Sequence, residues 1–301
     1  MQNYAFLFNE WWYVLILALV MVLSGEIKQY NLFSPFYSYI IDKVKNKKLL
    51  VMMISFLGGI LPIPGRVIVS AGLLDTIASN DPLKRSKLGI IDYLATHHYY
   101  NWSVLESTIL IPMAVLSLSY WSVMGYLWPL LLGSIIFTGT YIWKLKSEDI
   151  NISKNVTCER SDIKPWYGFI KWDIIIFLFG IILFGNFVKH YNSFFKDYIQ
   201  TCLTNNLQFA LLSIIAFIAS FVLGSSSKFA GIVALLTSVC GLHYFTYFFA
   251  LEYTGYLLSP NHKCVYIGMS YFKTPIWEYY KVLVLWSLVL LGIGIASLSF
   301  Y

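Results

Sequence analysis

The stretch Phe56-Leu-Gly-Gly-Ile-Leu-Pro-Ile-Pro-Gly-Arg66 interrupts one apolar region, and Phe221-Val-Leu-Gly-Ser-Ser-Ser-Lys228 interrupts another. Each begins with Phe-x-x-Gly and continues through helix-breaking residues to one basic residue and a run of small and aliphatic residues. The two apolar regions, 49–78 and 206–240, are therefore predicted to be broken or re-entrant helical hairpins. Irregular backbone inside a membrane is tolerated only where it is buried in protein or lines a cavity.

The composition predicts that a lipid bilayer surrounds these hairpins. Of the 301 residues, 58% are hydrophobic and 12% are charged, which is about half the charged share of a soluble domain. Six further apolar segments approach the length of about 20 residues that one crossing needs: 5–24, 103–122, 124–143, 167–188, 242–258 and 277–300. We expect an all-α, polytopic protein of the cell (inner) membrane. No basic region precedes the first apolar run, so we expect no cleavable signal peptide.

Basic residues predict which ends of the segments face the cytoplasm. They cluster before the first hairpin, after it, and in the central polar stretch: Lys43 to Lys48, Lys84 to Lys87, and Lys144 to Lys164. The positive-inside rule places all three clusters in the cytoplasm. The first hairpin then enters and leaves on one side, and the N-terminus is expected outside.

The order of these segments repeats along the chain. We expect a first repeat at 1–143, a cytoplasmic linker at 144–166 and a second repeat at 167–301, each with about three crossings plus a hairpin. An odd number of crossings inverts the second repeat relative to the first. Inverted repeats with broken helices at the midplane are the layout of many secondary transporters. Packing needs alone are the alternative explanation for the two breaker-rich segments.

Arg66 and Lys228 are candidate substrate-binding residues at the two hairpin tips. A basic residue inside an apolar stretch costs about 2.5–3.5 kcal/mol by insertion scales, so it needs a partner or a cavity. Each could anchor an anion, or each could lie at the lipid headgroups if its hairpin is shallow. Ser70 follows Arg66 and is a further candidate, although small residues there also suit close helix packing.

Four residues are candidates for binding a coupling proton or Na⁺: Asp92, His97, Glu106 and Glu252. A carboxylate inside a membrane span is costly and usually functional, and a histidine titrates near neutral pH. The alternatives are an interfacial belt of Tyr, His and Trp around His97, and an ion pair for Glu252. Asp75 is expected either to cap the next segment or to pair with a nearby base.

The break Ser259-Pro260-Asn261-His262 ends an apolar segment with a proline. Its hydroxyl, amide and imidazole groups make Ser259, Asn261 and His262 candidates for substrate binding, and an ordinary interhelical loop is the alternative. Four cysteines without a CxxC pair and five histidines without metal-ligand spacing give no cofactor or metal pattern. Motifs of hydrolases and nucleotide-binding enzymes do not occur, so we expect a non-enzyme that binds no nucleic acid.

Several of these motifs resemble a prokaryotic integral-membrane family of unknown function, the one numbered 401, related to the gluconate-permease and citrate-carrier branch of the ion-transporter superfamily. The resemblance rests on Leu61-Pro-Ile-Pro-Gly65, on Asp92-Tyr93 with His97, and on Ser259-Pro-Asn-His-Lys-Cys264 with Tyr271-Phe-Lys273. The chain departs from the family pattern where Arg66 replaces a second glycine and Thr96 replaces an arginine. The resemblance implies inverted repeats, re-entrant hairpins and a site between their tips. Related carriers often pair, so a homodimer is compatible with it.

The sequence therefore favours a secondary active transporter of an organic or inorganic anion, working by alternating access and coupled to H⁺ or Na⁺. One alternative is a translocase for a polyprenyl phosphate or another lipid phosphate. The others are an intramembrane enzyme that acts on a lipid headgroup, with a histidine as acid or base, and a membrane subunit whose partner carries the activity.

Overall fold

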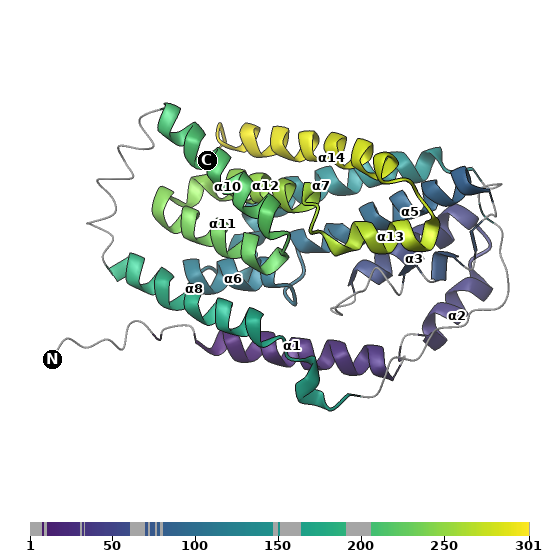
Figure 1. The fold of residues 1–301 in the computed structure, drawn as a ribbon, viewed down its shortest axis with the longest axis horizontal. Helices are drawn as coiled ribbons and strands as arrows, with labels where there is room; N and C mark the ends of the chain where they lie inside the picture. The colour runs from purple at the N-terminus through teal and green to yellow at the C-terminus, as the bar shows by residue number, and fades with distance from the viewer. Residues whose placement is uncertain are drawn as a thin grey trace.

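The computed structural model describes most of the chain as helices. The described residues are 11–30, 34–60, 81–146, 164–190, 206–300, 70–78 without Gly72 and Thr76, and Phe8, Leu32 and Ile150. These residues contain no β-strand, only an isolated antiparallel bridge between Ala78 and Ile150. The predicted all-α class is confirmed. Most helices lie along the long axis of the molecule (Figure 1).

The helices of the first half of the chain are α1 (Trp12–Gln29), α2 (Ser34–Lys43), α3 (Lys47–Ile60), α5 (Pro82–His97), the 3₁₀ helix η2 (His98–Asn101), α6 (Ser107–Leu116) and α7 (Tyr120–Lys144). The second half has η4 (Trp166–Phe169), α8 (Trp172–His190), α10 (Asn206–Leu223), α11 (Ser226–Cys240), η5 (Leu242–Tyr244), α12 (Phe245–Leu258), α13 (Lys263–Phe272) and α14 (Ile276–Ser297). The predicted breaks in 206–240 and after Leu258 both occur. The tip of the first hairpin lies outside the described residues.

The apolar segment 103–122 is not the single span that its composition predicts. Helix α6 starts at Ser107 and stops after ten residues, because Ser117 adopts a left-handed conformation (φ 52°, ψ 41°). The Leu118 N–H then closes the helix end on the carbonyl of Met113 at 3.1 Å. Ser119 caps the next helix, where its hydroxyl accepts the N–H of Ser122 at 3.1 Å.

Large apolar side chains cover much of the outside, whereas polar side chains gather within. Trp121, Ile176 and Leu288 are more than half exposed. Asp92, His97, Thr96, Glu252 and Thr254 are buried, as are other polar residues of α5 and α12. In the described part of the chain, α7 and α14 are long and apolar enough to cross a membrane, by length and composition alone.

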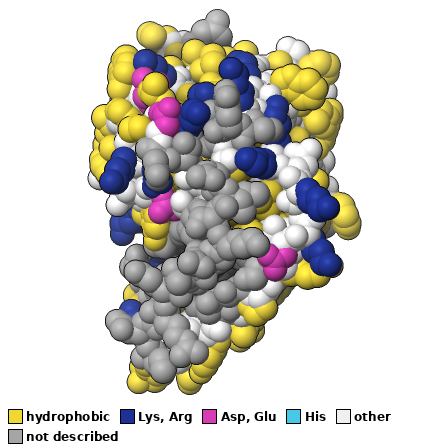
Figure 2. Space-filling view, turned by 90° about the vertical axis from the view of Figure 1, so that its right-hand side faces the viewer, with side chains coloured by type: hydrophobic (Ala, Val, Ile, Leu, Met, Phe, Trp, Pro, Cys, Tyr) yellow, Lys and Arg dark blue, Asp and Glu magenta, His cyan; other side chains and the backbone are white. Residues whose placement is uncertain are grey.

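One end of the molecule is basic. Figure 2 shows Lys and Arg side chains gathered on the end that lies on the right in Figure 1. Two lysines of the first predicted basic cluster bind the backbone near the start of the central polar stretch. Lys47 donates to the carbonyl of Ile150 at 2.7 Å, and Lys48 donates to the carbonyl of Trp143 at 2.9 Å. These lysines therefore share one end of the molecule with the start of the central stretch.

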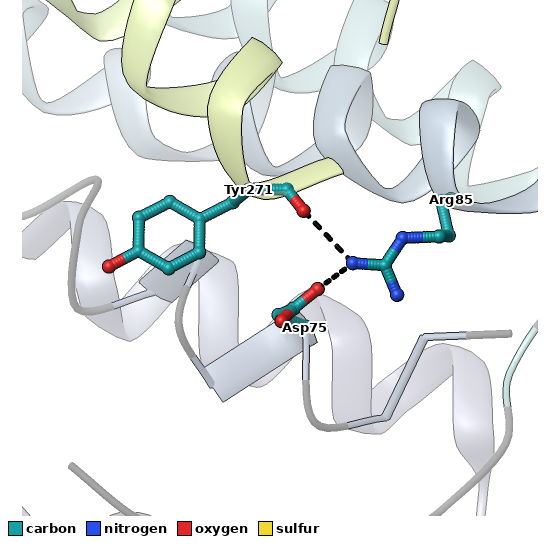
Figure 3. A network of polar contacts seen from close by, with 3 residues as sticks. All are labelled: Asp75, Arg85 and Tyr271. Carbon is teal, nitrogen blue, oxygen red and sulfur yellow. Dashed lines mark hydrogen bonds and ion pairs between the residues drawn. The ribbon is translucent and has the colours of Figure 1, made fainter. Parts of the chain in front are cut away.

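Arg85 joins three segments near this end (Figure 3). Its guanidinium donates to the carboxylate of Asp75 and to the carbonyl of Tyr271, the latter at 2.9 Å. The expectation that Asp75 pairs with a nearby base is confirmed. Tyr271 lies in the last turn of α13, where a cation also interacts favourably with the helix dipole. The contact ties α5 to both the 73–75 turn and α13.

Arg85→Ala is expected to lower the free energy of unfolding by about 2 kcal/mol, because hydrogen bonds to charged groups contribute about 1.5–3 kcal/mol each and the site is partly exposed. Thermal unfolding of the purified protein in detergent measures the change. Lys281→Ala is the matched control, since Lys281 forms an exposed pair with Glu278 on one helix and its loss should cost less than about 0.5 kcal/mol. Equal destabilisation by the two changes would contradict the prediction.

Candidate functional site

Two interrupted helix pairs meet inside the molecule. Helix α5 continues into α6 through residues 98–106, and α12 continues into α13 through 259–262. The hydroxyls of Tyr100 and Tyr256 lie 2.9 Å apart, and the hydroxyl of Tyr253 donates to the carbonyl of His97 at 2.8 Å. In both contacts the two residues are 156 positions apart in the sequence.

The same separation of 156 residues relates α6 to α13. Both helices have ten residues, and both end at a residue with left-handed conformation, Ser117 (φ 52°) and Lys273 (φ 51°). In the preceding turns, Ser103 Oγ accepts the N–H of Leu105 at 3.4 Å, and Ser259 Oγ accepts that of Asn261 at 3.1 Å. Tyr100 and Tyr256 are therefore counterparts under this spacing, and they meet where the two interruptions contact each other.

Near this tyrosine contact, Tyr93, His97 and His262 form a closed ring of hydrogen bonds. His97 Nδ1 lies 2.6 Å from the carbonyl of Tyr93, so Nδ1 carries the proton and Nε2 a lone pair. That Nε2 lies 3.2 Å from Nε2 of His262, which is then the donor. His262 Nδ1 in turn accepts the hydroxyl of Tyr93 at 2.9 Å. Both imidazoles are buried, so the ring joins the two halves of the chain in the interior.

A buried carboxylate, Asp92, precedes Tyr93 in α5 and has hydroxyl groups near it. The hydroxyl of Ser70 donates to Asp92 Oδ2 at 3.1 Å, Ser55 lies beside the same carboxylate, and Tyr279 is near enough to interact with it electrostatically. Thr274 lies next to the Tyr279 hydroxyl. Within the described residues, Asp92 Oδ1 and the hydroxyl oxygens of Ser55, Thr274 and Tyr279 make no hydrogen bond. Carboxylate and hydroxyl oxygens are ligands for hard cations.

A second buried carboxylate, Glu252, has a similar neighbour in the second half. Its Oε2 accepts the hydroxyl of Ser220, and its Oε1 has no hydrogen-bond partner within the described residues. Ser220-Phe221 corresponds to Ser55-Phe56 when the two Phe-x-x-Gly entries are aligned. Each half of the chain therefore places one carboxylate against a serine of its own broken hairpin.

Near the interruptions, α11 begins with a serine-rich turn. The hydroxyl of Ser227 donates to that of Ser107 at 3.1 Å, so the first turns of α11 and α6 meet. The amide of Asn261 donates to the carbonyl of Val222 at 2.7 Å, which joins the tip of α10–α11 to the 259–262 break. Lys228 lies in the first turn of α11, is partly buried and has no ion-pair partner among the described residues.

The predicted site residues divide into groups. His97 and His262 are brought together, Ser70 contacts Asp92, and Ser259 and Asn261 share one turn near Lys228's hairpin. Glu252 is buried in α12 and makes no ion pair with a described basic residue. Arg66 lies outside the described residues.

Glu106 differs from its expected position inside a span. It precedes α6 as the N-cap, and its Oε2 accepts the N–H of Ser107 at 3.0 Å. A carboxylate there is favoured by the positive end of the helix dipole. The expectation that Glu106 lies within a continuous apolar helix is therefore wrong.

Three residues of the site have no signal of their own in the sequence. Tyr256, Ser55 and Ser220 are ordinary residues in apolar helices. Tyr93 belongs to a motif of the family resemblance, but that motif gave it no role. A further signal is the match of Ser103-x-x-Glu106 with Ser259-x-x-His262 at a distance of 156 residues, in which only the serine is identical. Contacts across that distance follow from the fold.

A comparison with protein families gives one match, and it covers the second half of this arrangement. Residues 150–299 match the family DUF401. This family is described as "Protein of unknown function", so the match supports the resemblance to an uncharacterised family. The DUF401 match includes Lys228, Glu252 and the 259–262 break. No curated protein and no solved structure matches the chain.

Proposed function

We propose that this chain is a secondary active transporter of an organic or inorganic anion, coupled to the movement of Na⁺ or H⁺. The observation that carries the proposal is the spacing of 156 residues between matching features of the two interruptions, which contact each other and which we interpret as parts of inverted repeats. In transporters with inverted repeats, helices broken near the bilayer midplane form the binding site, and the repeats move against each other around it.

Membrane embedding is supported by the distribution of side chains. Exposed apolar residues on α7, α8, α10 and α14 and buried polar residues on α5 and α12 suit a lipid exterior and a polar interior. The basic end in Figure 2 is the cytoplasmic side by the positive-inside rule. Helix α1 ends nearer to this end than it begins (Figure 1), which agrees with an outside N-terminus.

The positions of the hairpins support the inversion of the repeats. Helix α3, the first arm of the first hairpin, lies towards the basic end, whereas α10 and α11 lie towards the opposite end (Figure 1). Helices α7 and α14 begin 156 residues apart, and in the described part of the chain they are the two helices long and apolar enough to cross a membrane. Under the proposed inversion they are equivalent crossings that hold the two repeats together.

The anion is proposed to bind between the first turn of α11 and the 259–262 break. Backbone N–H groups at a helix start are not used by the helix itself and favour an anion. Neither Ser225, the N-cap of α11, nor His262, the N-cap of α13, makes a side-chain capping bond. Lys228 supplies the positive charge, and Ser259 and Asn261 supply polar groups. Asp92 and Glu252 are the proposed cation-binding carboxylates.

A translocase for lipid phosphates is a second candidate, favoured by one cavity. It has a volume of about 330 Å³, lies between α3, α5 and α7, and is lined almost entirely by apolar side chains, including Met52, Phe56 and Ile135. His98 and Thr138 are its polar lining residues. An isoprenoid or acyl chain fits such a lining, with its phosphate at the polar centre.

Thermal unfolding in detergent against a panel of ligands tests the two candidates. The panel contains dicarboxylates, sugar acids, inorganic phosphate and polyprenyl phosphates, with and without Na⁺ and at two pH values. A ligand at 100 times its Kd stabilises the folded state by about 2.7 kcal/mol. Stabilisation by a soluble anion that depends on Na⁺ or on low pH is expected. Stabilisation by polyprenyl phosphates alone would favour the translocase, and no stabilisation by any ligand would contradict both.

Lys228→Ala is expected to remove the stabilisation by the anion while the unliganded protein keeps its melting temperature. The reason is that Lys228 has no ion-pair partner to lose among the described residues. Lys281→Ala on the exposed surface is the matched control and should leave anion binding unchanged. Unchanged anion binding by the Lys228 variant would remove this residue from the site.

A further inference from the structure

We propose that His97, His262 and Cys264 form a binding site for a divalent transition-metal ion, with Zn²⁺ as the best match, that clasps the two halves of the chain together. The binding is independent of the proposed transport function. Only its consequence for transport rests on that function.

The positions of the donor atoms carry this inference. One ring nitrogen of each histidine and the sulfur of Cys264 all lie within 4.8 Å of one another. The two Nε2 atoms are 3.2 Å apart. Bonds of about 2.0 Å from zinc to nitrogen in a tetrahedral site place two nitrogens about 3.3 Å apart. The imidazoles therefore have the separation that a shared zinc ion requires, and the sulfur needs a shift of only about 1 Å.

Tyr93 makes a hydrogen bond to Nδ1 of each histidine, the ring nitrogen that does not face the proposed metal. Its carbonyl accepts Nδ1–H of His97 at 2.6 Å, and its hydroxyl lies 2.9 Å from Nδ1 of His262. Histidines that bind metals usually donate their other ring N–H to such an oxygen, which fixes the tautomer and aims the free nitrogen at the metal. With the proton of His262 moved to Nδ1, both Nε2 lone pairs face the same point. Thus one residue orients both nitrogen ligands.

The ligand types select the metal. Two imidazoles and one thiolate suit Zn²⁺ and its analogue Co²⁺, whereas Mg²⁺ and Ca²⁺ prefer oxygen ligands. Metal binding displaces the thiol proton of Cys264 into solution, because the thiolate is the ligand. Three protein ligands leave the fourth tetrahedral position for water. Cys264 is partly exposed while both histidines are buried, which gives the ion a route to the site.

The site connects residues that lie far apart in the sequence. His97 ends α5 in the first half, whereas His262 and Cys264 begin α13 in the second half. Metal bonds across this contact would hold α5 and α13 in one arrangement. Zn²⁺ is therefore expected to stabilise the protein and to inhibit any transport that needs the two halves to move.

Titration of the reduced, tag-free protein in detergent with Co²⁺ tests the site directly. Binding of one Co²⁺ per chain, with the absorption of a thiolate–cobalt bond, is expected, and added Zn²⁺ should abolish that absorption. Cys264→Ser should remove the thiolate band, and Tyr93→Phe should weaken binding about 10- to 100-fold through the loss of an outer hydrogen bond. Cys240→Ser and His243→Ala are matched controls that should bind Co²⁺ like the unmodified protein.

Absence of the thiolate band from the unmodified protein, or its persistence in Cys264→Ser, would overturn the site. Thermal unfolding without metal shows whether each variant folds. If Cys264→Ser does not fold, the weaker Co²⁺ binding expected of Tyr93→Phe still tests the site. Metal binding without inhibition of anion uptake would contradict only the inference that the metal holds α5 and α13 in one arrangement. Anion uptake in a protein that binds no metal would contradict the site and leave the proposed function standing.

Discussion

Asp92→Asn is expected to reduce cation-dependent anion uptake by at least about 30-fold and to remove the stabilisation of the protein by the coupling cation. Asp92 is buried, its Oδ2 accepts the hydroxyl of Ser70, and its Oδ1 has no partner within the described residues. Loss of one member of a buried charge pair costs about 2–5 kcal/mol, and 1.4 kcal/mol corresponds to a factor of ten. Asparagine keeps the shape and one acceptor, so the protein should still fold.

Uptake into proteoliposomes and thermal unfolding with and without Na⁺ measure the two effects separately. Ser55→Ala removes one neutral hydroxyl beside the carboxylate and should weaken the cation effect by less than Asp92→Asn. Glu278→Gln is the matched control, because Glu278 is exposed and pairs with Lys281 on the surface of α14. A variant at Asp92 that keeps full cation-dependent uptake would show that this carboxylate does not bind the coupling ion.

Part of the fold follows from the local sequence. Gly224-Ser225 ends α10 and starts α11 where the sequence predicts a break, and Ser259-Pro260 ends α12. Glycine has a low helix propensity, and proline lacks the N–H that a helix interior needs. These breaks can therefore be predicted from the local sequence alone. The helical class follows from the long apolar segments.

The interruption at 98–106 was not predicted, because it contains no proline or glycine and four of its nine residues are tyrosine, tryptophan or histidine, which helices and interfaces both tolerate. Tertiary contacts stabilise it instead. Thr108 donates to the carbonyl of Tyr100 at 2.7 Å, and Tyr120 donates to that of Trp102 at 2.9 Å. Backbone groups freed by the interruption are thereby satisfied, which no local pattern encodes.

The pairing of His97 with His262 could not be predicted either, since 165 residues separate them. Each histidine stands out as a polar residue near an apolar segment, and the sequence assigned them different roles, ion coupling and substrate binding. Their contact arises because the two interruptions pack against each other in the interior. The same packing brings Tyr100 to Tyr256, its counterpart at a spacing of 156 residues. Such contacts depend on the fold and are independent of separation along the chain.

Gly224→Ala is expected to lower the free energy of unfolding by about 2–5 kcal/mol and to weaken anion binding. Gly224 has a φ of 54°, which costs a residue with a side chain about 1–2 kcal/mol. A Cβ atom there would also lie 2.6 Å from Cβ of Asn261 and 2.7 Å from Oγ of Ser259. Such an overlap in a packed interior adds about 1–3 kcal/mol.

The added Cβ atom would overlap residues of the 259–262 break, where this break contacts the tip of α10–α11. Two of these residues, Ser259 and Asn261, are proposed anion ligands. Ser259 and Asn261 must move away, so anion-dependent stabilisation should fall even where the variant stays folded. Gly125→Ala in α7 is the matched control, because a Cβ atom added at Gly125 would meet no other atom within 4 Å and alanine favours a helix by up to about 1 kcal/mol. If both variants had the same stability and the same anion response, the tight contact at Gly224 would not support the binding site, and the two breaks would have to be considered independent features of the fold.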